Sequence, residues 1–348
     1  MRVAIVHDDL VQCGGAERVL EGLCEIFPDA PIYTSVFNRN NSQLQRRFGS
    51  KKIITSFLQN IPGWKKLYKV LLPLYPIAFE QYDFTGFDLV ISHTTRFAKS
   101  IITKPSTTHI CYCHTPPRFL WNFSGYKCPK LLQPLFLKLR VYDQVSARRV
   151  DHFVAGSKNA SMRVKKIYKQ NSEVVYPFID LDRFKNVEPF NGEYFVVIGR
   201  KNRYKRFDLA ISACLKLEVD LKVIGGGWQK LAIDKVEFMG NLSDRMVVNV
   251  LAGARALIVP GEEDFGLTPL EAQALGKPVI AYAAGGALET VIDNKTGILF
   301  KEQTVDCLLS AIRRLDGKKI KARDCKENAA RFSKMIFLQN FKQVIARL

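Results

Sequence analysis

The sequence predicts an α/β protein built from two doubly wound domains in series. Short apolar runs bounded by turn residues recur along all 348 residues, and each has the length of a buried parallel strand. Segments with helical periodicity alternate with these runs, as in strand–helix–strand units. Because single cores stop growing at roughly 250 residues, this length favours two domains over one.

The first domain is predicted to span residues 1–177. Its helical segment at 17–27 places its apolar side chains on one face, and the segment at 157–169 opens on Ser157, a residue type that caps helix N-termini. Its expected strands are 3–6, 88–92, 109–113, 152–155 and 173–176.

A polar, proline-containing stretch, 178–192, is predicted to be the domain linker, and the strand–helix alternation then resumes over 193–330. A basic amphipathic segment, 331–348, follows this second domain. Two such domains in series lead us to expect a ligand cleft between the carboxyl ends of both sheets. The expected strands of the second domain are 194–199, 221–224, 236–239, 256–260 and 279–282.

The charge balance indicates anionic partners. Lys and Arg number 52 against 33 Asp and Glu, a formal net charge of +19, which attracts polyanions, anionic membrane faces and phosphorylated substrates. No apolar stretch reaches the roughly 20 residues of a membrane-spanning helix. The start of the chain is too short for a signal-peptide core, so a cytoplasmic protein is expected.

The eight cysteines show no paired CxxC spacing and are interpreted as reduced and structural. Cys111, Cys113 and His114 form the one group that could suggest zinc. A strand would point the two cysteines to one face and His114 to the other, which disfavours a shared metal.

The sharpest functional pattern lies after the strand at 256–260. Thr268 suits an N-cap, so the backbone amides of 266–270 would form an anion site at a helix start. Thr268 and Glu271 also have the spacing of a capping box, which would explain Glu271 without any ligand. No capping rule explains Glu263, whose carboxylate could bind sugar or ribose hydroxyls.

A basic run follows the first strand of the second domain, with five cations in residues 200–206, among them Arg200 and Lys205. A solvated surface would explain such a run. A diphosphate leaving group that lacks a metal, however, requires fixed cations at the end of a strand, and that interpretation is favoured.

Three weaker signals complete the candidate residues. Gly14 and Gly15 follow the first strand and allow close approach to an anion, without the GxGxxG or P-loop patterns of dehydrogenases and ATPases. His114 ends a buried strand, where a histidine is as often structural as catalytic. Asp180 and Asp182 match a short metal-binding pattern of sugar transferases, but they lie in the linker and are set aside.

Together these residues resemble the retaining family-four glycosyltransferases of the GT-B fold, along nearly the whole chain. The resemblance implies two Rossmann-like domains facing across a cleft and a final helix that crosses back to the first domain. The matching residues are the paired glutamates Glu263 and Glu271, the phosphate clamp Arg200 and Lys205, and the glycine loop Gly14 and Gly15.

Within this family, the runs 110–121 and 262–266 resemble a bacterial mannosyltransferase subgroup that builds surface polysaccharides such as the O-antigen of lipopolysaccharide. This implies GDP-mannose as the donor and a lipid-linked or saccharide acceptor. The stretch 92–99 departs from the pattern, because small serines are expected where His93 and Arg96 stand.

The resemblance also implies a role for each site residue. Arg200 and Lys205 would neutralise the departing diphosphate, and Glu271 would hold the ribose. Glu263 would contact the transferred sugar, and His114 would bind its hydroxyl. The remaining donor-binding residues are Gly14, Gly15, Asp264, Phe265, Gly266, Leu267 and Thr268. Neither a metal ion nor a cofactor is expected beyond the nucleotide-sugar substrate.

Lipid-linked acceptors also imply peripheral association with the inner face of the plasma membrane. Interleaved basic and aromatic residues indicate a docking segment, although a core helix with a basic outer face would give the same pattern. The residues concerned are Lys51, Lys52, Trp64, Lys65, Lys66, Tyr68 and Lys69.

Three alternatives stay open at this point. A basic nucleic-acid-binding protein would explain the charge but neither the two glutamates nor the glycine loop, so nucleic acid is not expected as a partner. The other two are a UDP-sugar transferase of the same fold and a catalytically silent scaffold.

Overall fold

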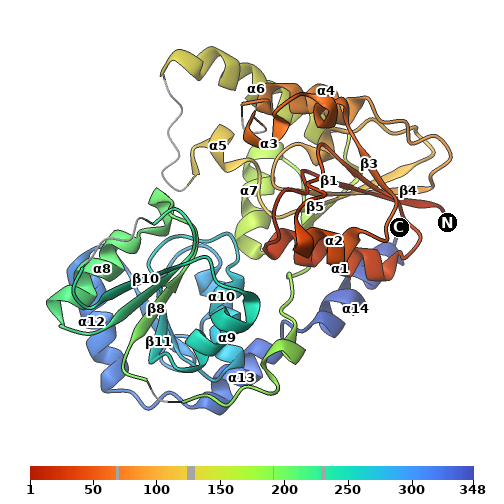
Figure 1. The fold of residues 1–348 in the computed structure, drawn as a ribbon. Helices are drawn as coiled ribbons and strands as arrows, with labels where there is room; N and C mark the ends of the chain where they lie inside the picture. Colours follow the sequence, from red (N-terminus) through yellow and green to blue (C-terminus); the bar gives the residue numbers. More distant parts are fainter. Residues whose placement is uncertain (68–69, 124–129, 191, 229–232) are drawn as a thin grey trace. The chain divides into compact units, whose positions relative to one another are not determined.

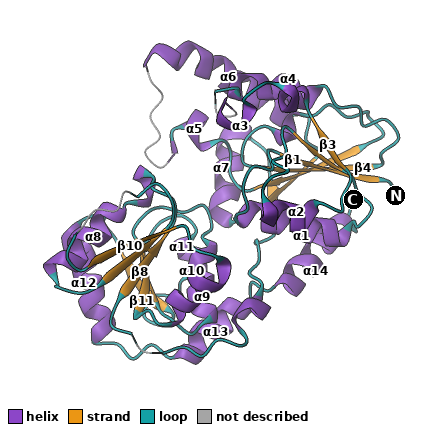
Figure 2. Cartoon of the chain, viewed as in Figure 1, coloured by secondary structure: helices purple, strands orange, loops and turns teal. Residues whose placement is uncertain are grey.

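The computed structural model describes residues 1–67, 70–123, 130–190, 192–228 and 233–348. The described chain forms two compact units, coloured by sequence in Figure 1. Unit 1 comprises Met1–Pro177 together with Phe337–Leu348, and unit 2 comprises Phe178–Ile336. Each unit contains one parallel sheet with helices around it, as Figure 2 shows.

The sheet of unit 1 has seven parallel strands in the order β3-β2-β1-β4-β5-β6-β7. The chain order reverses between β1 and β4, which makes their carboxyl ends the switch point of this sheet. The strands are β1 (Val3–His7), β2 (Ile32–Thr34), β3 (Ile53–Thr55), β4 (Leu89–Thr94), β5 (Thr108–Cys113), β6 (His152–Ala155) and β7 (Ser172–Val174).

The helices of unit 1 connect these strands. Ser157 caps one of them as predicted, because its Oγ accepts a hydrogen bond from the amide of Ala160 at 2.9 Å. The α-helices are α1 (Gly15–Ile26), α2 (Ser42–Phe48), α3 (Trp64–Leu67), α4 (Tyr75–Glu80), α5 (Arg118–Trp121), α6 (Gln133–Ala147) and α7 (Lys158–Tyr168). The 3₁₀ helices are η1 (Phe57–Asn60), η2 (Leu72–Leu74), η3 (Ala98–Ser100) and η5 (Lys130–Leu132).

The sheet of unit 2 has six parallel strands in the order β10-β9-β8-β11-β12-β13, and its switch point lies between β8 and β11. Its strands are β8 (Phe195–Ile198), β9 (Leu221–Ile224), β10 (Val236–Gly240), β11 (Ala256–Val259), β12 (Val279–Tyr282) and β13 (Gly297–Phe300). Its helices are η6 (Leu181–Phe184), η7 (Arg203–Lys205), α8 (Phe207–Lys216), α9 (Asp244–Ala252), α10 (Leu267–Ala274), α11 (Ala287–Thr290), α12 (Val305–Asp316) and α13 (Ala322–Ala330).

Both faces of the unit 2 sheet are buried. Along β8, Phe195 and Val197 belong to one hydrophobic cluster, whereas Val196 between them belongs to the cluster on the other face. This alternation explains why its central strands read as continuous apolar runs in the sequence.

The last helix, α14 (Lys334–Ile345), joins unit 1 from Phe337 onward. Phe337 and Phe341 pack their rings against Tyr112 of β5, each with ring centroids 6.1 Å apart. Arg347 also pairs with Glu173, with 2.8 Å between Nη1 and Oε2. In the part of the chain that the structure describes, every helix falls short of the length and apolarity needed to cross a bilayer.

The predicted α/β class with two parallel sheets is confirmed, and the differences lie at or next to the sheet edges. The pattern missed β2, β3 and β13, which have only three or four residues. It also placed a strand at 173–176, but β7 ends at Val174, two residues before the Tyr176–Pro177 step. Proline restricts the preceding residue and lacks the amide hydrogen that a ladder requires.

The docking segment expected around α3 is wrong at its central aromatic residue. Trp64 is only 8% exposed and packs in the core of unit 1, which removes it from any contact with a surface. Lys65 and Lys66 are exposed, as a basic outer face of a core helix would be. Tyr68 and Lys69 lie outside the described residues.

Candidate active site

In unit 2 two loops meet at the carboxyl edge of the sheet, beside its switch point. One follows β8 and carries Lys205, and the other follows β11 and contains Gly261. A Cβ atom on Gly261 would lie 2.2 Å from the carbonyl oxygen of Tyr204, and one on Gly199 would lie 3.0 Å from Cε of Lys205. Glycine at position 261 therefore lets the two loops touch, and glycine at position 199 leaves room for the Lys205 side chain beside its own loop.

This approach brings Lys205 to Glu263. The Nζ atom of Lys205 lies 2.5 Å from Oε1 of Glu263, and the two side chains are 18% and 17% exposed. Two residues that the sequence nominated separately thus form one ion pair, 58 residues apart in the chain.

The structure divides the basic run after β8 among different partners. Lys201 lies over the ring of Trp228, 5.2 Å from its centroid, and Arg206 pairs with Asp208. Arg200 is exposed on the same loop. The run therefore is not a uniform solvated patch, and Lys205 is its member held at the switch point.

The helix start after Glu263 differs from the prediction. The N-cap of α10 is Gly266 with φ of 90°, and the helix begins at Leu267, so Thr268 lies inside the first turn instead of capping it. Glycine adopts this positive φ without steric cost, which permits the earlier start. The capping box of Thr268 and Glu271 consequently does not form.

Glu271 instead pairs with a residue that the sequence did not single out. Glu271 is only 5% exposed, and Nη1 of Arg183 donates a hydrogen bond to Oε1 at 2.9 Å. Arg183 belongs to η6, in the stretch predicted as linker. It is 88 residues away in the chain, so no local pattern could connect the two.

The loop that carries the donor-binding candidates is anchored by the residues after β12. The amide of Gly286 donates to the carbonyl of Glu263 at 2.9 Å, and a Cβ on Gly286 would lie 2.1 Å from the carbonyl oxygen of Phe265. Phe265 is buried, and Asp264 and Thr268 are half-buried, as is Leu267. The backbone of this loop is thus held in one position.

The two aspartates of the linker have local partners. The carboxylate of Asp180 accepts a hydrogen bond from the amide of Asp182 at 3.2 Å and caps η6. Asp182 pairs with Lys185, with 2.5 Å between Oδ1 and Nζ. Among the described residues, no group of three His, Cys, Asp or Glu side chains suits a metal ion.

In unit 1, the glycine loop lies at the carboxyl end of β1. Gly14 is the N-cap of α1, which begins at Gly15, and the amide of Gly14 donates to Oε2 of Glu17 at 2.7 Å. Glu17 is buried, and its Oε1 lies 3.8 Å from Nε2 of His7. Neither Glu17 nor His7 carries a sequence pattern that predicts a site residue.

Asp8 organises the loop that follows β4. Its carboxylate accepts hydrogen bonds from the amides of Thr95, Phe97 and Ala98 at 2.6, 2.9 and 2.8 Å. Burial alone would raise the pKa of Asp8, but the positive charges of Arg96 and His7 and the amide hydrogen bonds lower it below its usual range.

The two residues at which the sequence departs from the family pattern both contact other side chains. Arg96 pairs with the buried carboxylate of Asp9. His93 is fully buried in β4, and strand register places it beside His7 of β1 and Tyr112 of β5. Serines could not make these contacts.

His114 follows β5 directly and is half-buried. Its Nε2 lies 2.6 Å from Nε2 of His93, and Nδ1 of His93 lies 2.8 Å from Nδ1 of His7. Cys111 and Cys113 occupy the other face of β5 as free thiols in a hydrophobic cluster, as the strand geometry predicted. The three histidines and Glu17 thus form one connected group at the switch point of unit 1.

Comparison with known proteins covers both units. Residues 13–183 match the family model described as Glycosyltransferase Family 4, and residues 178–332 match the model described as Glycosyl transferases group 1. The chain is a glycosyltransferase built from these two domains. The family-four resemblance inferred from the sequence is confirmed at this level.

Among its relatives, the glycosyltransferase is 25% identical to the α-1,3/1,6-mannosyltransferase ALG2 of Dictyostelium discoideum, covering 100% of this chain and 98% of that protein. It is 24% identical to ALG2 of Mus musculus, covering 87% of this chain and 85% of the relative. Among solved structures, sucrose-phosphate synthase from Thermosynechococcus elongatus is similar, with a TM-score of 0.76 and 18% identity over 100% and 99% of the two chains. Anabaena HepE in complex with UDP-glucose has a TM-score of 0.72 and 17% identity over 100% of both chains. These structures confirm the GT-B fold.

Proposed function

We propose that this glycosyltransferase moves mannose from GDP-mannose to a lipid-linked or saccharide acceptor, with retention of the anomeric configuration and without a metal ion. Similarity along 87–100% of this chain to proteins named as α-1,3/1,6-mannosyltransferases supports the sugar. The ion pair of Lys205 and Glu263 at the switch point of unit 2 carries the chemical part of the proposal, because it provides a fixed cation where a diphosphate can lie.

The leaving group determines what the site must supply. As the bond from the anomeric carbon to the β-phosphate oxygen breaks, the electron pair stays on the phosphate and negative charge grows there. Lys205 and Arg200 meet this charge, together with the backbone amides at the start of α10, where the N-cap Gly266 has no side chain to cap the helix. The acceptor oxygen bonds to the anomeric carbon on the same face, and its proton passes to the departing phosphate.

The carboxylates bind the uncharged parts of the donor. Glu263 holds the ammonium of Lys205 and accepts hydrogen bonds from hydroxyls of the transferred sugar. Glu271 accepts hydrogen bonds from the ribose hydroxyls, and its pairing with Arg183 fixes the orientation of the carboxylate. In unit 1, His114 binds a hydroxyl of the transferred sugar.

The second candidate is a UDP-sugar donor. It is favoured by one observation, that HepE shares the fold and its structure contains UDP-glucose. The two donors differ in the base and in the sugar, so the comparison of donors decides between them.

The deciding experiment is acceptor-independent release of the nucleoside diphosphate from GDP-mannose, UDP-glucose and ADP-glucose at equal concentration. GDP release is expected to be fastest. Thermal shifts with GDP, UDP and ADP provide a second readout, since a ligand at a hundred times its dissociation constant adds about 2.7 kcal/mol of stability. Faster release and a larger shift with the uridine nucleotide would replace GDP-mannose by a UDP-sugar. The Arg200→Ala variant, which lacks one of the proposed phosphate cations, serves as the control for hydrolysis at this site.

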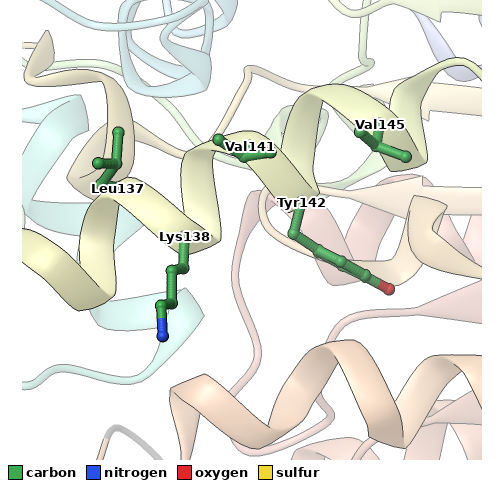
Figure 3. A pocket seen from close by; sticks show the side chains of 5 residues that line it. All are labelled: Leu137, Lys138, Val141, Tyr142 and Val145. Carbon is green, nitrogen blue, oxygen red and sulfur yellow. The ribbon is translucent and has the colours of Figure 1, made fainter.

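We further propose that the enzyme is a peripheral protein of an anionic membrane, in keeping with a lipid-linked acceptor of surface-polysaccharide synthesis such as that of O-antigen. The support is the outer face of α6. Leu137, Val141 and Val145 follow one another at intervals of four residues, are exposed, and project from one side of the helix in Figure 3. Leu131, just before α6, is 91% exposed.

The charges around this apolar face favour anionic lipid over another protein. Lys130, Lys138 and Arg148 are exposed beside it, whereas Asp143, the one acidic residue of α6, is fully buried. An exposed apolar stripe with basic flanks is typical of a helix lying in the membrane interface.

Flotation with vesicles tests this surface. Wild-type protein is expected to float with vesicles containing phosphatidylglycerol and far less with neutral phosphatidylcholine vesicles. Leu137→Glu should abolish flotation, whereas Leu288→Glu in α11 should not, although the two leucines are 56% and 58% exposed. Equal recovery with both lipids, or equal effects of both substitutions, would contradict the proposal.

A further inference from the structure

A buried chain of polar groups connects the glycine loop of unit 1 with His114. It begins at the amide of Gly14, which donates to Glu17 at 2.7 Å, and continues to His7, 3.8 Å from the other carboxylate oxygen. From His7 it passes to His93 at 2.8 Å and from His93 to His114 at 2.6 Å. The role proposed for His114 uses neither His7 nor His93.

Strand register builds this chain. His7 of β1 lies directly beside His93 of β4, and His93 lies beside Tyr112 of β5, one residue before the end of that strand. The ring of His93 stacks on His7 with 5.0 Å between centroids and meets His114 edge to face at 4.6 Å. Each ring is therefore fixed in position by its neighbours.

The charges that face the three rings are unevenly distributed. Glu17 of α1 and the carboxylates of Asp8 and Asp9 lie around His7, with Arg96 of the loop after β4 bound to Asp9. Burial lowers the pKa of His7, but the negative charges of Glu17, Asp8 and Asp9 outweigh this effect, and the net pKa is raised.

His93 has the opposite character. Burial, and then the repulsion that a positive charge on His114 or His7 exerts on a second one, hold the pKa of His93 well below its usual value, so its ring is neutral. On β5, Tyr112 packs against the rings of His93 and His114; burial raises its pKa well above the usual value, so it adds no charge.

These states determine where the protons lie. Protonated His7 carries hydrogens on both nitrogens, so its Nδ1 donates to Nδ1 of His93. Neutral His93 must then carry its proton on Nε2 and donate it to Nε2 of His114. A neutral His114 that accepts at Nε2 carries its own proton on Nδ1.

We propose that His93 is a positioning residue for the transfer reaction, because it links His114 to the buried His7 and thereby sets which nitrogen of His114 bears the proton. The inference rests on the proposed role of His114 at a hydroxyl of the transferred sugar. It explains why histidine stands at position 93, where the family pattern would place a serine.

Loss of one proton from the three histidines reverses the direction of the hydrogen bonds between them. The proton on Nδ1 of His114 leaves to solvent or substrate, the proton on Nε2 of His93 passes to His114, and that on Nδ1 of His7 passes to His93. The net change is one proton released, with His7 converted from imidazolium to imidazole. His114 then presents a lone pair at Nδ1 where it had presented an N–H group, which changes the hydrogen bond it offers to a sugar hydroxyl.

Long-range ¹H–¹⁵N NMR of the imidazole rings tests the coupling without any turnover, and the chain has only five histidines. In the wild type, the tautomer of His114 is expected to switch at the pH at which His7 titrates. His93→Ser should uncouple the two titrations, and His7→Gln should remove the switch while keeping an amide in its place. The matched control is His109→Gln, a fully buried histidine of the same sheet bonded to Ser92, which should leave the spectrum of His114 unchanged.

The second readout is the pH profile of sugar transfer. His93→Ser is expected to lower kcat about tenfold or more, to change KM for the donor less than about twofold, and to remove the inflection that reports His7. His93→Gln, which keeps a donor and an acceptor, should recover part of the loss. His109→Gln should follow the wild-type profile.

The outcomes separate the two proposals. If both substitutions at positions 93 and 7 leave the tautomer of His114 and the pH profile as in the wild type, the inference is wrong even when GDP-mannose proves to be the donor. If GDP-mannose is not turned over but the NMR switch depends on His93, the donor assignment fails and the histidine coupling stands.

Discussion

Lys205→Ala is predicted to slow the breaking of the sugar–phosphate bond about a hundredfold while weakening nucleotide binding much less. Lys205 is held against Glu263 at 2.5 Å by two loops whose contact requires Gly261, so its ammonium is in place before the donor binds. Removing one preorganised contact to growing charge costs about 3 kcal/mol in the transition state, which corresponds to roughly a hundredfold in rate. Binding suffers less, because the extra charge develops during the reaction.

The ion pair adds a second, sharper expectation. In Lys205→Ala, the carboxylate of Glu263 loses its partner and repels the departing diphosphate. In a double-mutant cycle, the double variant Lys205→Ala with Glu263→Gln should therefore raise the activation free energy by less than the sum of the increases in the two single variants.

Single-turnover release of the nucleoside diphosphate measures the chemical step directly, and calorimetry measures the affinity for the nucleotide. The matched control is Lys201→Ala, which removes a cation of the same loop that lies over Trp228. The reasoning is refuted if Lys205→Ala stays within about threefold of the wild type, or if Lys201→Ala is equally slow. The second result would mean that only the total charge of the loop matters.

Three further predictions concern affinity and stability. Glu271→Gln should weaken nucleotide binding about tenfold by calorimetry, as expected for a lost charged acceptor; an unchanged affinity would limit Glu271 to its structural pair with Arg183. Asp143→Ala leaves the fully buried ammonium of Lys99 unpaired and should lower the free energy of unfolding by about 3–5 kcal/mol in urea, whereas a loss below about 1 kcal/mol would contradict this. Burial lowers the pKa of His109 to about 4, so the wild type should lose on the order of 3 kcal/mol as the pH falls from the unfolded-state value of about 6.5 toward 4. The His109→Gln variant should lose correspondingly less stability over the same pH range, and an equal loss in both proteins would argue against that pKa.

The central strands could be predicted because both faces of each sheet are buried. The runs around Val3 and Leu257 have few polar positions, so their apolar length alone marks them as parallel strands. The edge strand β3 and its neighbour β2 have three residues each and carry no such signal. The helix start at Leu267 was missed because a threonine followed by proline resembles a cap, whereas the φ of Gly266 depends on the loop that precedes it.

Site residues could be predicted where they directly follow an element that the sequence itself predicts. Lys205 and Glu263 each follow a predicted strand, and parallel strands end at the same edge of a sheet. Arg183 could not be found in this way, because its role depends on a contact with Glu271 across 88 residues. The histidine chain depends on strand order: the register of β1 beside β4 brings His7 to His93, 86 residues away.

Turnover of GDP-mannose in excess EDTA tests the central claim most directly, because the account assigns the leaving-group charge to Lys205, Arg200 and the amides at the start of α10. We predict that the rate of GDP formation with EDTA equals the rate without it, and that added Mn²⁺ does not increase it. Abolition of activity by EDTA with recovery on adding Mn²⁺ would contradict the account and would return Asp180 and Asp182 to consideration as metal ligands.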